Sequence, residues 1–225
     1  IHVILSIIAI FYFYRLLKIF FNESISLLGL AAFAFFPLNV FSVSQISSIT
    51  LQIFLTILFF FYFISFFKFG NKNYLIKFSI ISALLILLRG EFIMIYIFTL
   101  ILISIKKKSI KVIILGISIS LIVTFPYLMR NYLIFDQITI TKSFGYNLWK
   151  GNNNFSNSQG NEKIYNNVMQ EKIENIKPSK DYDIKIDEIY KEEGFQNIKE
   201  NPKKYIKNYF KKIFSFLFVD FNSTY

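Results

Sequence analysis

Two groups of residues in this chain could do chemistry, and the first is Arg89-Gly90-Glu91, which separates two apolar runs. A guanidinium group binds a phosphate through two parallel hydrogen bonds and keeps its charge, so Arg89 is a candidate phosphate ligand with Glu91 beside it. Charged side chains at membrane depth are costly unless they pair or face a polar cavity. The simpler alternative is that the two side chains pair with each other and reach lipid headgroups.

The second group lies between Pro126 and Asn154, where the apolar half of the chain gives way to a charged one. We expect the helix before it to end at Pro126, Ile138–Thr141 to form a short strand, and Gly145–Asn154 to form a loop. The alternatives are that the Asn-rich run is a linker and that the lone tryptophan is an interfacial anchor. The candidate phosphate- or sugar-binding residues here are Arg130, Asn131, Asn147, Trp149, Asn152 and Asn153.

This second group also carries a family resemblance. The run P-x-x-x-R-N-Y-x-x-F, followed by S-x-G-x-N-L-W-x-G-N-N, resembles the segment that closes the membrane core of bacterial polyprenyl-phosphate-dependent glycosyltransferases. These enzymes are relatives of the protein O-mannosyltransferases and lipid A aminoarabinose transferases and have the GT-C fold. The matching residues are Pro126, Arg130, Asn131, Tyr132, Phe135, Ser143, Gly145, Asn147, Leu148, Trp149, Gly151, Asn152 and Asn153.

The resemblance implies transfer of a sugar from a polyprenyl-phosphate donor to an acceptor (a lipid, a glycan or a protein) at the outer face of a membrane. It favours Arg89 as the residue that faces the donor phosphate. The base of that family is an acidic residue in a loop before the helix with which this chain begins, and Ser42–Thr50 contains no acid. We therefore assign no catalytic residue to this chain, which we interpret as cut at both ends and inactive alone.

No cofactor is identified, and a requirement for a divalent metal is left open. The chain has no cysteine, and His2 is its one histidine, so neither a thiolate site nor a histidine metal site can be built from it. Gly145 and Gly151 lack the Lys-Ser/Thr pair of a phosphate loop.

Composition predicts a mainly α, polytopic transmembrane helical bundle, GT-C-like in the light of the resemblance. Of 225 residues, 54% are hydrophobic and 20% aromatic, and the mean hydropathy is +0.48, more apolar than a soluble domain of this size requires. We expect about six apolar helices in residues 1–129, incomplete at the N-terminus. Their ranges are Ile1–Tyr14, Ser24–Phe41, Leu51–Phe67, Tyr74–Leu88, Phe92–Ile105 and Val112–Tyr127.

Charge predicts the orientation of these helices. The balance is +8 for residues 1–129, −1 for residues 130–201 and +4 for residues 202–225. The excess positive charge lies beside the apolar runs and in every second connection between them, which is the positive-inside pattern. A nucleic-acid-binding protein would instead gather its positive charge on one soluble face, so nucleic-acid binding is not expected. We expect a multi-pass protein of the inner (plasma) membrane, with lipid as a partner and residues 130–201 on the outer, periplasmic side.

We expect the outer segment to be a small α/β unit. Helices are predicted at Asn161–Ile176 and at Asp181–Tyr190, the second interrupted at Gly194. An amphipathic helix beginning at Asn201-Pro202 should lie on the membrane surface before a further, truncated span. Acids that alternate with lysines predict a solvated face.

The competing hypothesis is a fragment of a transporter or flippase with an intramembrane Arg89/Glu91 site, and a structural subunit is a third. Transporters are expected to show internal repeats and short loops. We find no repeat, and the outer segment exceeds seventy residues, which favours the transferase. In that case the stretches Pro126–Tyr132 and Gly145–Asn153 should pack together near Arg89.

Overall fold

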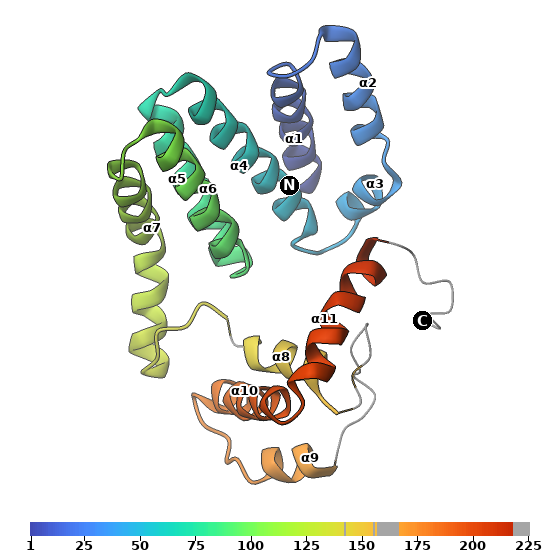
Figure 1. The fold of residues 1–225 in the computed structure, drawn as a ribbon, viewed down its shortest axis with the longest axis vertical. Helices are drawn as coiled ribbons and strands as arrows, with labels where there is room; N and C mark the ends of the chain where they lie inside the picture. Colours follow the sequence, from blue (N-terminus) through green and yellow to red (C-terminus); the bar gives the residue numbers. More distant parts are fainter. Residues whose placement is uncertain (142, 155, 157–166, 218–225) are drawn as a thin grey trace. The chain divides into compact units, whose positions relative to one another are not determined.

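The computed structural model describes residues 1–141, 143–154, 156 and 167–217, and within these ranges the chain contains eleven helices and no strand (Figure 1). It divides into two compact units, Ile1–Arg130 and Asn131–Tyr225. The mainly helical prediction is confirmed. The α/β prediction for the outer segment is wrong within the described residues.

The first unit contains six helices and most of a seventh, which continues past Arg130. They are α1 (His2–Leu17), α2 (Glu23–Ala34), α3 (Pro37–Ser44), α4 (Ile49–Phe69), α5 (Lys72–Leu88), α6 (Phe92–Lys107) and α7 (Lys111–Phe135). The expected single run Ser24–Phe41 is two helices, α2 and α3, because the ring of Pro37 cannot continue α2 and instead occupies the first turn of α3. The two helices are bent by 49°.

Two helices of the described residues, α4 and α7, are long and apolar enough to cross a membrane, and the bent pair α2–α3 could be a third span. The helices α5 and α6 have 17 and 16 residues. At 1.5 Å per residue each reaches about 25 Å, short of a bilayer core of ~30 Å. That is the length expected of a hairpin whose turn lies below the membrane surface.

The core of the first unit forms around α4, which packs against α1 and α5. This helix is apolar all round, as a helix with neighbours on several sides must be. Phe59 of α4 and Phe78 of α5 are fully buried with ring centroids 4.9 Å apart, and Phe78 lies 5.4 Å from Tyr96 of α6. These rings join the three helices.

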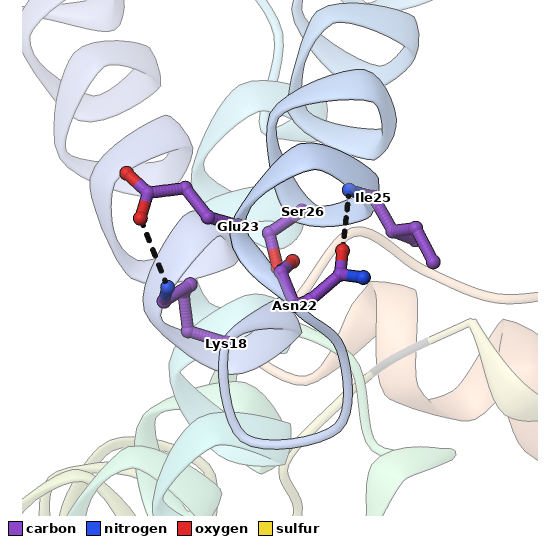
Figure 2. Close-up of polar contacts among 5 residues, drawn as sticks. All are labelled: Lys18, Asn22, Glu23, Ile25 and Ser26. Atoms are coloured by element: carbon purple, nitrogen blue, oxygen red, sulfur yellow. Dashed lines mark hydrogen bonds and ion pairs between the residues drawn. The ribbon is translucent and has the colours of Figure 1, made fainter.

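The turn between α1 and α2 is fixed by local polar contacts (Figure 2). The side chain of Asn22 caps α2 by accepting a hydrogen bond from the backbone N–H of Ile25 at 3.0 Å. Lys18 at the end of α1 lies 3.6 Å from Glu23, which is favourably placed in the first turn of α2.

Helix α7 does not end at Pro126, as the sequence analysis expected, but continues to Phe135. A proline lacks the N–H group and so removes one helical hydrogen bond. The helix nevertheless continues through Pro126, which has apolar residues on both sides. Helix α7 ends where Asp136 adopts a left-handed conformation (φ 55°) and donates its N–H to the carbonyl of Tyr132 at 2.8 Å. Aspartate is one of the few residues other than glycine that tolerate this geometry.

The second unit contains α8 (Phe144–Asn152), α9 (Asn167–Glu174), α10 (Tyr182–Glu200) and α11 (Pro202–Leu217). Its core is Trp149, Met169 and Tyr190, with four partly buried side chains against them: Tyr146, Ile173, Ile186 and Ile189. The predicted amphipathic helix is confirmed as α11, whereas the span expected after it and the first part of Asn161–Ile176 lie outside the described residues.

Three local predictions for this unit are wrong. Ile138–Thr141 has no strand, since none of the residues that the structure describes forms a second strand to pair with it, and the Thr139 hydroxyl instead donates to the carbonyl of Thr141. Most of Gly145–Asn154 is helical, as α8. Helix α10 runs through Gly194 without interruption.

Candidate functional site

The basic residues of the first unit gather at one end of the helices. The Lys68 ammonium donates to the carbonyl of Ile19 at 2.9 Å, which joins the end of α4 to the end of α1. A Cβ built on Gly70 would lie 2.8 Å from Nζ of Lys107, which brings the end of α6 to the same place. The α1–α2, α4–α5 and α6–α7 turns accordingly lie at one end of the unit (Figure 1).

Several of these cations lie over aromatic rings. Nζ of Lys106 is 3.8 Å from the centroid of Phe67, and the guanidinium carbon of Arg15 is 5.2 Å from that of Phe61. Such contacts keep the charge and shield the apolar surface beneath it. We refer to this end as the basic end; its residues are Arg15, Lys18, Lys68, Lys72, Lys77, Lys106, Lys107, Lys108 and Lys111.

Arg89 lies at the opposite end, in the turn between α5 and α6. The predicted break between these helices is confirmed, with α5 ending at Leu88 and α6 beginning at Phe92. The Arg89 side chain is 44% exposed and meets Glu91 at 3.5 Å, and Glu91 is 68% exposed. The Arg89 side chain therefore lies at the surface of the unit and not in its interior, because a turn of three residues leaves it exposed.

Two features make this turn suitable for an anion. The amino end of α6 carries a partial positive charge, and Arg89 precedes it by three residues. The space beside Gly90 is open, since a Cβ built there meets no atom within 4 Å. Of the eleven Lys and Arg residues in residues 1–130, only Arg89 and Arg130 lie away from the basic end, and both side chains are exposed.

Most of the amides chosen from the sequence hold their own backbone in place. Nδ2 of Asn131 donates to the carbonyl of Thr139 at 2.7 Å, that of Asn152 to Leu148 at 2.8 Å, and that of Asn153 to Lys150 at 3.3 Å. Asn131 and Asn153 are also buried, at 3% and 5% exposure. Asn147 is the exposed amide of the set.

Trp149 is a core residue and not an open stacking face. It is 7% exposed, and its ring centroid lies 5.1 Å from that of Tyr190 and 6.4 Å from that of Tyr146. The physical cause is the amphipathic character of α8, which turns Tyr146 and Trp149, three residues apart, toward α10.

The residue that organises this region is one that no sequence pattern singled out. Asp187 of α10 accepts hydrogen bonds from the backbone N–H groups of Gly145 and Tyr146, both at 2.9 Å. These groups belong to the first turn of α8, whose N-cap Ser143 makes no side-chain capping bond. A carboxylate from a distant helix thus caps α8 and complements its dipole, whereas the sequence had placed Asp187 on a solvated face.

A hollow of about 290 Å³ lies beside this cap, lined by Ser143, Tyr146, Asp183, Ile186, Asp187 and Tyr190. Carboxylates accept hydrogen bonds from hydroxyl groups, and a phenol ring adds an apolar surface. Nearby at the start of α10, hydrogen bonds from Lys185 and Ser179 lower the pKa of Asp181 to about 2. The hollow therefore places carboxylate groups beside an apolar ring surface.

Comparison with known protein families, with curated proteins and with solved structures yields no match.

Proposed function

We propose that the chain is part of an integral-membrane glycosyltransferase that moves a sugar from a polyprenyl-phosphate donor to an acceptor at the outer face of the inner membrane. The observation that carries this proposal is the separation of charge in the first unit. Nine basic residues form the basic end, and the two that lie elsewhere, Arg89 and Arg130, are both arginines. By the positive-inside rule the basic end is cytoplasmic, so these two arginines face the outside.

Arg89 suits the donor's leaving group. The phosphate of the lipid must be held while its bond to the sugar breaks, and a guanidinium binds it in a fixed, two-pronged geometry. The contact between Arg89 and Glu91 is long and exposed, and exposed ion pairs contribute only about 0–1 kcal/mol. A phosphate can therefore take the place of Glu91. No residue of this chain is assigned as the base that deprotonates the acceptor.

Within the second unit, the hollow beside the Asp187 cap offers a surface for a sugar. Asp183 lines the hollow beside the Asp187 cap and carries a carboxylate, a group that accepts hydrogen bonds from sugar hydroxyls, and Tyr146 offers a ring. With Trp149 buried, this hollow takes over the sugar-binding role that the sequence had given to the Trp149 ring. Asn147 of α8 remains an exposed candidate.

The first prediction concerns orientation. Because the chain has no cysteine, single cysteines report it cleanly. In intact cells a Lys180→Cys variant should react with a membrane-impermeant maleimide, and a Ser109→Cys variant should react only after permeabilisation. Lys180 is exposed, whereas Ser156, also in the outer segment, is 6% exposed and unsuitable. The opposite labelling would place Arg89 in the cytoplasm and refute outer-face transfer.

The second prediction separates the transferase from its competitor. The bent pair α2–α3 is a broken helix of the kind that transporters use, and this favours a transporter or flippase acting through Arg89 and Glu91. Membranes that contain the full-length protein should move radiolabelled sugar from a polyprenyl-phosphate donor to an endogenous acceptor, and membranes without it should not. If the labelled lipid changes leaflet and keeps its sugar, the protein is a transporter.

A further inference from the structure

Helix α11 presents three different faces, and the first is already occupied within the second unit. Nζ of Lys204 donates to the carbonyl of Asn154 at 2.7 Å, and Nζ of Lys212 to that of Gly151 at 2.9 Å. Nδ2 of Asn208 donates to the carbonyl of Ser156 at 3.3 Å, and Tyr205 is 5% exposed. These four residues form the docking face, which holds α11 against the carboxyl end of α8; burial there lowers the pKa of Lys212.

The second face is an uncovered apolar stripe. Its residues follow the i, i+3, i+4, i+7 spacing of one side of a helix, and all are large and exposed. They are Ile206 at 59%, Tyr209 at 66%, Phe210 at 58% and Ile213 at 43% exposure. Removing such side chains from water is favourable, so a stripe of this regularity indicates a surface that is covered in the native setting.

The third face is a row of lysines at i, i+4 and i+8: Lys203, Lys207 and Lys211. All three are exposed. At 100° per residue the row lies between the apolar stripe and the docking face. The sequence Pro202–Leu217 contains five lysines and no acid. The lysine row therefore borders the apolar stripe with charge of one sign.

We propose that the stripe and the lysine row bind the surface of a bilayer rich in anionic phospholipid. The stripe enters the boundary between headgroups and acyl chains, and the lysines meet the phosphates. The charge decides between occupants. A second copy of α11 would bring its own lysines against these and be repelled, whereas an anionic headgroup layer matches the whole row at once.

The three faces of α11 have separate roles in this binding. Lys204 and Lys212 are engaged with backbone carbonyls, so lipid selectivity belongs to Lys203, Lys207 and Lys211. The docking face joins the lipid-bound helix to the end of α8, so lipid binding also holds the α8–α10 core at the surface. Lipid binding by α11 is independent of the glycosyl transfer proposed above.

The test uses a Phe210→Cys variant of the full-length protein, carrying an environment-sensitive fluorophore on its single cysteine. The protein is placed in nanodiscs that contain spin-labelled phosphatidylcholine, with or without phosphatidylglycerol. We expect strong quenching of the fluorophore in the anionic discs and weaker quenching in the zwitterionic ones. Adding K203Q, K207Q and K211Q should reduce the ratio of lipid-bound to free α11 in anionic discs by roughly fivefold for each lysine.

The matched control carries K180Q, K191Q and K199Q, which remove the same charge from exposed positions outside α11 and should leave the quenching unchanged. Equal quenching in both kinds of disc and in both triple variants would overturn the role of the lysine row. Absence of quenching in every disc would show that the stripe does not enter the bilayer and would overturn the proposal altogether.

Discussion

Replacing Gly145 with alanine should separate α8 from α10. A Cβ at Gly145 would overlap the carbonyl oxygen of Asp187 and lie 2.8 Å from the backbone nitrogen of Lys191. These atoms belong to the middle of α10 and cannot rotate away, as a side chain could. Overpacking costs about 1–3 kcal/mol of stability when side chains can adjust. A clash with a helix backbone should therefore cost about 3 kcal/mol or more. The variant would also lose the Asp187 cap.

Hydrogen–deuterium exchange of the full-length protein measures this effect. The amides of Phe144–Asn152 should exchange much faster in the variant. Gly151→Ala is the control in the same helix, since its Cβ would meet only the movable end of Lys212, at 2.9 Å, and alanine favours a helix over glycine by up to about 1 kcal/mol. Unchanged protection in Gly145→Ala would mean that the two helices do not cross this closely.

Features that depend on neighbouring residues could be predicted from the sequence. The separation of α5 from α6 follows from Arg89-Gly90-Glu91, where charges and a glycine interrupt an apolar run. Helix α11 follows from Asn201-Pro202 and a regular apolar spacing. The order of basic and apolar segments along the chain also predicts that Arg89 lies at the opposite end of the helices from the basic end.

Features decided by distant contacts could not be predicted. Gly145 and Gly194 look like signals for a loop and a break, but both are places where helices approach closely: a Cβ on Gly194 would lie 3.1 Å from the backbone nitrogen of Trp149. The sequence does not show that Asp187, more than forty residues away, caps α8. The burial of Trp149 against Tyr190 depends on the same crossing, so its role was mistaken.

Replacing Arg89 with lysine should weaken use of the donor far more than it affects folding. Lysine keeps the charge but loses the paired N–H groups that hold a phosphate in a fixed orientation. Hydrogen bonds to charged groups contribute about 1.5–3 kcal/mol, so we expect a rise of roughly 10- to 100-fold in the KM for the lipid-linked sugar. Because the side chain is half-exposed in a turn, the amount of folded protein should not change.

The KM for the polyprenyl-phosphate sugar, measured in the full-length protein with Arg89→Lys and with Arg15→Lys, tests the central claim most directly. Arg15 lies at the basic end over Phe61, so the same exchange there keeps its cation and touches no donor. We predict a raised KM in Arg89→Lys and a wild-type KM in Arg15→Lys. Wild-type KM and kcat in Arg89→Lys, or equal losses in the two variants, would contradict the assignment of the donor phosphate to Arg89.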